Sequence, residues 1–187
     1  MPLPLLTDRL DIDLLQSADI DDFVRYRQNP DVARFQSWTT GYSVDDATSL
    51  VAGQPENALP AAGSWAQLAI RARNTSGLLG DVAIHRLDSQ PDTFEIGMTL
   101  APASQHRGIA TEAVLRVLEF LFTEAHTHRV IAECDARNEP VARLLAALGM
   151  RRECHQLEAD YFKGEWTTLD TWAILRREFA TSAPVVR

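Results

Sequence analysis

The residues best suited to chemistry lie in one short stretch, at the start of the strongest helical repeat of the sequence. The stretch reads Gln105-His106-Arg107-Gly108-Ile109-Ala110-Thr111-Glu112. A helix that begins here would expose unpaired N–H groups and the positive end of its dipole, which together bind phosphate. Gly108 would allow close approach of the main chain, while Arg107 adds charge and Thr111 a hydroxyl. The pattern also fits an ordinary turn, and it lacks the lysine of a P-loop and the glycines of a dinucleotide fingerprint.

The elements that must position this stretch are visible in the alternation between period 2 and period 3.6. The pattern predicts helices over residues 17–28, 44–51, 110–125 and 140–148, and strands over 9–14, 65–71, 79–87, 93–100, 129–134, 150–157 and 168–175. Asn29-Pro30 is expected to stop the first helix, and Ser43 with Asp46 to cap the second. The order predicts one α/β domain over residues 1–187, with a core of about 6–179, a mixed sheet of about seven strands, helices on both faces and a loose tail at 181–187.

The composition excludes several classes of protein. The 187 residues carry a formal net charge of −8 and show no basic run, so a nucleic acid is not an expected partner. No apolar run is long enough to span a membrane, and the start resembles no secretory signal, so we expect a cytoplasmic protein. Two cysteines without a CxxC spacing predict no metal site.

Several motifs in order resemble the GNAT N-acetyltransferases, and more narrowly their RimJ/RimL-like branch. The resemblance runs from about residue 6 to residue 179. It rests on Glu95-Ile96-Gly97, the Q-x-x-G-x-A loop, Ala110-Thr111-Glu112-Ala113, Asn138-Glu139, Leu148-Gly149-Met150, Arg152-Glu153 and the segment from Tyr161 to Trp166.

The resemblance implies a GNAT-like fold whose sheet is splayed between strands 93–100 and 129–134, with the arm of acetyl-CoA lying in the split. It implies that the cofactor contacts Met98, Leu100, Gln105, His106, Arg107, Gly108, Ile109, Ala110, Thr111 and Asn138. The amides of the cofactor would pair with the strand near Met98 and Leu100. Asn138 fits a helix N-cap equally well.

The resemblance also implies direct attack of a primary amine, on a protein N-terminus or a small molecule, in a ternary complex without a metal. It offers Glu95, Glu158 and Asp160 as candidate bases, although all three also fit solvated carboxylates. Trp38 and Tyr161 would flank the acceptor, with core packing as the alternative role of the tryptophan. Homodimers are common in the family, which makes a homodimer an alternative to a monomer.

Two positions depart from the family pattern. Leu145 stands where many relatives have a tyrosine, and Val141 where the branch often has a serine, so no hydroxyl is available there to protonate the leaving thiolate. The departure keeps a second hypothesis open, that of a module that binds acyl-CoA without turnover.

Overall fold

The computed structural model describes residues 3–56 and 58–182, which alternate between strands and helices. In chain order the elements are β1 (Leu5–Leu6), β2 (Leu10–Leu14), η1 (Ser17–Asp19), α1 (Ile20–Arg27), α2 (Pro30–Ala33), α3 (Val44–Ala52), β3 (Trp65–Ala72), β4 (Leu78–Arg86), β5 (Thr93–Leu100), η2 (Pro102–Ser104), α4 (Ile109–Thr123), β6 (Arg129–Asp135), α5 (Glu139–Ala147), β7 (Arg151–Phe162), β8 (Glu165–Leu175) and α6 (Arg176–Ser182).

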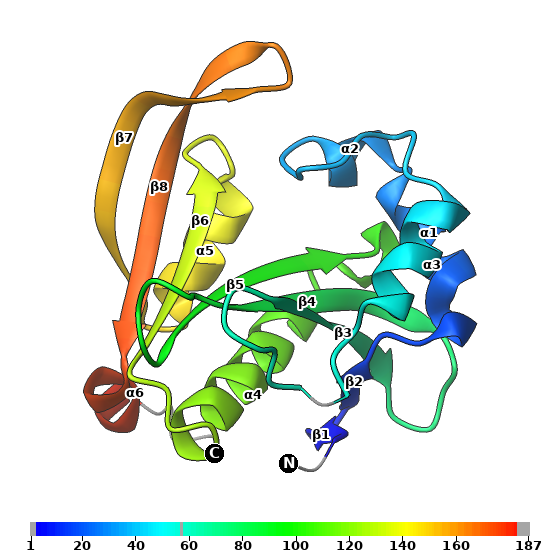
Figure 1. Ribbon diagram of the computed structural model, residues 1–187, viewed down its shortest axis with the longest axis horizontal. Coiled ribbons are helices and arrows are strands. Elements are labelled where there is room, and N and C mark those ends of the chain that lie inside the picture. The colour runs from blue at the N-terminus through cyan, green and yellow to red at the C-terminus, as the bar shows by residue number, and fades with distance from the viewer. Residues whose placement is uncertain (1–2, 57, 183–187) are drawn as a thin grey trace.

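One eight-stranded sheet runs through the molecule in the order β1-β2-β3-β4-β5-β6-β8-β7 (Figure 1). Every pair of neighbouring strands is antiparallel except β5 and β6, which are parallel and are joined by the crossover helix α4. The class is the expected mixed α/β fold, and the strand beyond the expected seven or so is the two-residue β1.

Helices cover both faces of the sheet and enclose two separate clusters of buried side chains. The larger cluster packs α4 and α5 against the strands, and the smaller packs α1 and α3 against the opposite face, where Ala69 and Leu78 belong to it. The helices α1, α2 and α3 lie on one side of the molecule and the elements β6, α5, β7 and β8 on the other, and we call these two sides its walls (Figure 1).

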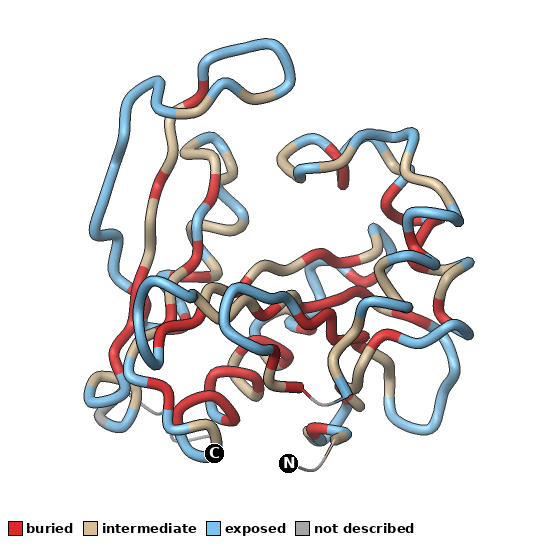
Figure 2. The backbone as a smooth tube through the Cα atoms, viewed as in Figure 1, coloured by how far each residue is buried: buried red, intermediate tan, exposed pale blue. Residues whose placement is uncertain are grey.

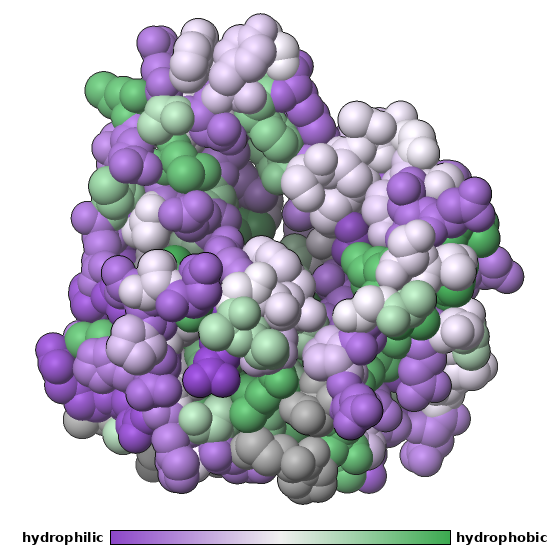
Figure 3. All heavy atoms as spheres, viewed as in Figure 1, coloured by the Kyte–Doolittle hydropathy of each residue, from purple (hydrophilic) through white to green (hydrophobic). Residues whose placement is uncertain are grey.

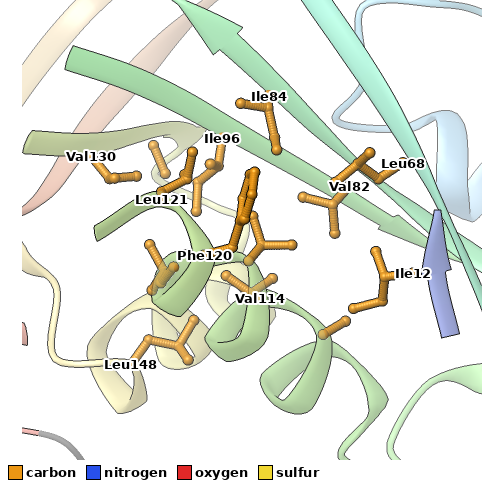
Figure 4. Packing of buried hydrophobic residues seen from close by; sticks show 14 of the residues in the cluster. Ile12, Leu68, Val82, Ile84, Ile96, Val114, Phe120, Leu121, Val130 and Leu148 are labelled. Atoms are coloured by element: carbon orange, nitrogen blue, oxygen red, sulfur yellow. The ribbon is translucent and has the colours of Figure 1, made fainter. Parts of the chain in front are cut away.

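The sequence predicts one apolar stripe on the helix that became α4, and the structure buries all of it except the half-buried Ala110: Ala113, Val114, Val117, Leu118, Leu121 and Phe122. Val114 and Leu121 of α4 point at the sheet residues Val82, Ile84 and Ile96 (Figure 4). Phe120, which lies outside the predicted stripe, is also fully buried. Since fully burying one large apolar side chain is worth about 1.5–3 kcal/mol, this helix is a principal anchor of the fold.

The sheet is split between its two parallel strands. β5 pairs with β6 only from Thr93 to Glu95, opposite Arg129 to Ile131, whereas β5 continues to Leu100 and β6 to Asp135. On their outer sides both strands remain paired. β5 pairs with β4 up to Leu100, and β6 pairs with β8 from Arg129 to Asp135. The separation leaves one edge of β5 without a strand partner beyond Glu95, which is the splayed geometry that the resemblance implied.

Three local expectations need correction. Asn29-Pro30 does end α1, but Asn29 also starts α2, since its Oδ1 accepts the N–H groups of Asp31 at 2.9 Å and Val32 at 3.3 Å. The last two strands are longer than predicted and form a hairpin whose outer part is exposed (Figure 2). The tail predicted to be loose begins inside α6, and residues 183–187 lie outside the described part of the chain.

Candidate active site

The loop before α4, which the sequence predicts to bind phosphate, turns sharply at Gly108 into the first turn of the helix. Gly108 is the N-cap of α4 with φ 73° and ψ 2°, a left-handed conformation that favours glycine, and no side chain caps the helix. The loop is tied to the end of β5 by Gln105, whose Nε2 donates to the carbonyl of Leu100 at 3.3 Å. The N–H groups of the first turn are therefore not engaged by a capping side chain, as a bound pyrophosphate requires.

A groove of about 490 Å³ begins at this helix N-terminus and runs along β5 towards α5. Nine of the ten predicted cofactor residues line it, namely Met98, Leu100, Gln105, His106, Gly108, Ile109, Ala110, Thr111 and Asn138. Arg107 does not line the groove. It is exposed, and its carbonyl oxygen accepts a hydrogen bond from Nη1 of Arg9 at 3.3 Å. We call this cavity the cofactor groove.

Asn138 makes no capping hydrogen bond at the start of α5, although its sequence context fits an N-cap. Its residue lines both the cofactor groove and a cavity of about 100 Å³ that lies between β5 and β6. The small cavity, which we call the split, is also lined by Cys134, and burial followed by the charge of Asp170 raises the pKa of this thiol to about 11. Val141 and Leu145 line the split as well. The two positions where relatives have a serine and a tyrosine hydroxyl therefore carry apolar side chains at this cavity.

A third cavity, of about 840 Å³, opens on the other side of the split, and we call it the acceptor pocket. Met98 and Gln36 line the groove, the split and the pocket alike, so the three cavities meet at these two residues. The molecule is visibly hollowed between its two walls (Figure 3). A ligand in the groove and a ligand in the pocket would thus meet at the middle of β5.

Aromatic and acidic side chains dominate the chemistry of the acceptor pocket. Its lining includes Trp38, Tyr42 and Trp65 together with the carboxylates of Asp81, Glu95 and Glu133, and Arg27 is the cation among them. Arg27 is buried and already paired with Asp81 at 3.3 Å. The pocket therefore presents net negative charge to a ligand.

Glu95 lies at the end of a row of side chains that crosses three strands. Trp65 on β3 pairs with His85 on β4, which in turn pairs with Glu95 on β5. The indole stacks on the imidazole with ring centroids 4.5 Å apart, and the imidazole Nδ1 is 3.3 Å from Oε2 of Glu95. The row fixes the carboxylate of Glu95 at the pocket wall, a role that sequence reasoning did not give to His85.

A buried polar network supports the floor of the same pocket. The carboxylate of Asp81 accepts hydrogen bonds from Tyr26, Arg27 and Gln67. Burial raises the pKa of Asp81, and the charge of Arg27 opposes that shift. The guanidinium of Arg27 is held between the rings of Phe23, at 3.9 Å, and Trp38, at 3.6 Å. Trp38 lines the pocket, and the buried guanidinium of Arg27 holds its ring in place.

The remaining predicted residues lie elsewhere. Glu158, Asp160 and Tyr161 line none of these three cavities. They lie on β7, where the pairing with β8 is irregular between Gln156 and Asp160, and Tyr161 packs against Trp166 on the exposed hairpin. Gln36 and Phe35 were missed by sequence reasoning, because the segment after α2 has no periodicity that marks it as part of a site.

The described residues contain no group of three or more His, Cys, Asp or Glu side chains arranged to hold a metal ion. Within the same residues, no helix is long and apolar enough to cross a membrane.

A splayed mixed sheet, a helix N-terminus without a capping side chain at the split and two cavities that meet on one strand form an arrangement suited to an acyl-CoA-dependent transferase. Residues 9–151 match the family profile described as acetyltransferase (GNAT) domain. The chain belongs to the GNAT acetyltransferase family, whose co-substrate is acetyl-CoA.

Known relatives agree with this assignment. The N-acetyltransferase p20 of Bacillus licheniformis, named as uncharacterized, is 27% identical over 94% of this chain and 98% of its own length. The crystal structure of a GNAT-family acetyltransferase from Bacillus anthracis superposes with a TM-score of 0.82 at 25% identity, covering 92% of this chain and 98% of the other. The spermidine N-acetyltransferase of Vibrio cholerae, solved in complex with CoA and spermine, shares the fold with a TM-score of 0.80 at 18% identity, covering 93% and 99% of the two chains.

Proposed function

We propose that the protein transfers an acetyl group from acetyl-CoA to a positively charged primary amine that enters through the acceptor pocket. The observation that carries the proposal is the meeting of the cofactor groove and the acidic pocket at Met98 and Gln36. Two reactants held on either side of one strand react as if within one molecule. Such positioning lowers the activation barrier by about 7–11 kcal/mol at best.

The cofactor would be held by the main chain. The N–H groups at the start of α4 would bind its pyrophosphate, and the free edge of β5 beyond Glu95 would pair with the amides of its arm. A main-chain N–H near Met98 would donate to the carbonyl oxygen of the acetyl group. Acetyl-CoA supplies the activated acetyl group when bound.

The residues of this chain must also deprotonate the amine. A lysine-like amine with a pKa of about 10.4 is neutral in only about one molecule in 10³ at pH 7, whereas an α-amine with a pKa of about 7.7–8.0 needs far less help. Glu95 is the carboxylate best placed to accept the proton, because it lines the pocket and is held there by His85. Its cross-strand neighbour His85 holds the carboxylate without lining the pocket itself.

The charge of the pocket favours a cationic acceptor over a neutral one. Glu133 and Glu95 line it, and its one cation, Arg27, is engaged by Asp81. The related fold from Vibrio cholerae was solved with spermine, a polyamine, which supports the same class of acceptor. A protein N-terminus is the alternative primary amine.

The experiment is a thiol-release assay of the purified protein with acetyl-CoA and a panel of amines, in which wild type is compared with Glu95→Gln. We expect amine-dependent release in the wild type and a loss of about 10²–10⁴-fold in kcat/KM for the variant, with CoA affinity unchanged. Glu158→Gln and Asp160→Asn are the matched controls, since the same loss of charge falls outside the three cavities. A wild-type rate in Glu95→Gln together with a loss in either control would move the base to β7.

The second candidate function is a module that binds acyl-CoA without turnover. Leu145 and Val141, which stand in the split in place of hydroxyl groups, are the observation that favours it. Tight CoA binding with no amine-dependent thiol release across the panel would select this alternative.

Placement in the RimJ/RimL-like branch, a homodimeric state and a cytoplasmic location complete the proposal. The first two rest on the motif resemblance, and the third on composition.

A further inference from the structure

The sequence contains one lysine among eighteen basic residues, and it stands in an unusual place. Lys163 occupies the turn between β7 and β8 with φ 49°, at the far end of the long hairpin. The tip of the hairpin bends towards the wall that carries α2 (Figure 1). A long, flexible cation at this tip can reach across to the opposite wall.

Lys163 makes that reach and binds main-chain oxygens on the other side. Its Nζ donates to the carbonyl of Ala33 at 2.5 Å and to the carbonyl of Trp38 at 2.7 Å. The carbonyl of Ala33 also accepts the N–H of Gln36 at 3.0 Å. One ammonium group thus joins both ends of the segment from Ala33 to Trp38.

The residues between these two carbonyls lie at the junction of the site. Phe35 and Gln36 line the cofactor groove and the split, while Gln36 and Ser37 line the acceptor pocket. A shift of this short segment would therefore change the shape of all three cavities at once.

The inner side of the segment is fixed by the buried network. The indole Nε1 of Trp38 donates to the carbonyl of Arg27 at 3.2 Å, and its ring stacks on the guanidinium of the same residue. Lys163 supplies the corresponding anchor on the outer side. Partial desolvation at this position lowers the pKa of Lys163.

We propose that Lys163 is a positioning residue that bridges the two walls of the molecule and holds the segment from Ala33 to Trp38 in the shape that receives the acceptor amine. The role deepens the proposed function and rests on it, since the acceptor pocket is the site that the bridge shapes. Lysine suits the task because its ammonium group donates in several directions to carbonyl oxygens at once.

The kinetic test compares Lys163→Met with the wild type and with Lys163→Arg. We expect Lys163→Met to raise the KM for the acceptor about tenfold, to change kcat by less than about threefold and to leave the dissociation constant of CoA within about threefold. Lys163→Arg keeps the charge and several donors and should restore most of the affinity. Arg25→Met is the matched control, because Arg25 is an exposed cation on α1 that pairs with Asp22 outside the site. Equal acceptor KM values in Lys163→Met and the wild type would overturn the proposal.

A second measurement needs no activity, and it remains valid if Lys163→Met does not fold. Wild-type protein is treated with N-hydroxysuccinimidyl acetate, and acetylation of the single lysine is followed by peptide mass spectrometry. We expect Lys163 to react at least about tenfold more slowly than the lysine of a synthetic peptide of residues 158–168, because its amino group must leave the carbonyls of Ala33 and Trp38 before it can attack the reagent, and this cost exceeds the opposite effect of its lowered pKa. Equal rates would refute the bridge. Slow labelling in a protein that transfers no acetyl group would instead refute the proposed function and keep the bridge.

Discussion

At the scale of single residues, the site depends on a few side chains whose neighbours settle what they do. Glu95 and Asp81 are both acidic residues of the acceptor pocket. The carboxylate of Asp81 accepts hydrogen bonds from Tyr26 and Gln67 and pairs with Arg27, whereas that of Glu95 contacts one imidazole, that of His85. The first carboxylate holds the pocket together, and the second remains available for a proton. The sequence offered Glu95, Glu158 and Asp160 as equal candidate bases. Only the tertiary structure distinguishes them, since Glu95 alone of the three lines the pocket.

Gly108 allows a residue-scale prediction in which backbone strain and charge are separated. Asn and Asp have the same shape and both tolerate a left-handed N-cap, so Gly108→Asn and Gly108→Asp share whatever strain φ 73° imposes. A Cβ at this position would meet only Arg9 Nη2, at an ordinary 3.5 Å. Because the aspartate adds a negative charge where the pyrophosphate is expected, we expect Gly108→Asp to bind CoA at least about tenfold more weakly than Gly108→Asn by calorimetry.

The same pair of variants contains its own control for folding. An aspartate N-cap favours a helix, so the melting temperature of Gly108→Asp should equal or exceed that of Gly108→Asn. Equal CoA affinities in the two variants would remove the phosphate from the start of α4.

At the scale of elements, the segments that follow a simple period were predicted and those held by tertiary contacts were not. The strand from Thr93 to Leu100 and the helix at Gly108 were found because alternation and an apolar stripe are local properties of the sequence. The segment from Ala33 to Trp38 has neither, and contacts with Arg27 and Lys163 hold its shape. Lys163 is remote in sequence, and no sequence pattern marks Arg27 as a contact of this segment. The extension of β7 was missed for a related reason, since its outer residues are exposed and leave no apolar alternation.

One carboxylate links the turn between β1 and β2 to the first turn of α4. Glu112 in the first turn of α4 accepts hydrogen bonds from Thr7 Oγ1 at 2.5 Å and from Arg9 Nε at 2.6 Å. Partial burial alone would raise the pKa of Glu112, but these donors and the charge of Arg9 outweigh burial and lower the pKa below its usual value. The contact also lies beside the loop, because Arg9 donates to the carbonyl of Arg107.

This fastening predicts a pH-dependent loss of stability. A folded-state pKa below the unfolded one means that the carboxylate stabilises the protein above the unfolded pKa and loses this contribution as the pH falls through the folded value. Glu112→Gln should therefore lower the free energy of unfolding by about 1 kcal/mol at pH 7, a modest figure since solvent screens Arg9. The difference from wild type should vanish below the folded pKa of Glu112 in denaturant titrations between pH 7 and pH 3. A difference that is independent of pH would mean that the carboxylate charge contributes nothing.

At the scale of the whole molecule, two walls meet along a split sheet and the chemistry lies where they diverge. The wall formed by α1, α2 and α3 brings the buried network and Trp38, and the wall formed by β6, β7 and β8 brings the split and Lys163. The strand β5 belongs to both, since it pairs with β4 along its length and with β6 only at its start. Composition could not locate this division, and it could not show that Asp81, Glu95 and Glu133 line the same pocket.

The charge of the whole molecule gives the last prediction. The formal net charge of −8 and the carboxylates of the acceptor pocket should attract a cationic acceptor over a distance that salt shortens, from about 10 Å at 0.1 M to about 3 Å at 1 M. Raising the ionic strength should therefore raise the KM of a diamine more steeply than that of a monoamine of equal length, while kcat stays constant for both. Glu133→Gln should reduce the slope for the diamine, because its carboxylate lines the pocket without belonging to the Asp81 network. Parallel slopes for the two amines would show that the acceptor carries one charge into the pocket and that the second one is not recognised.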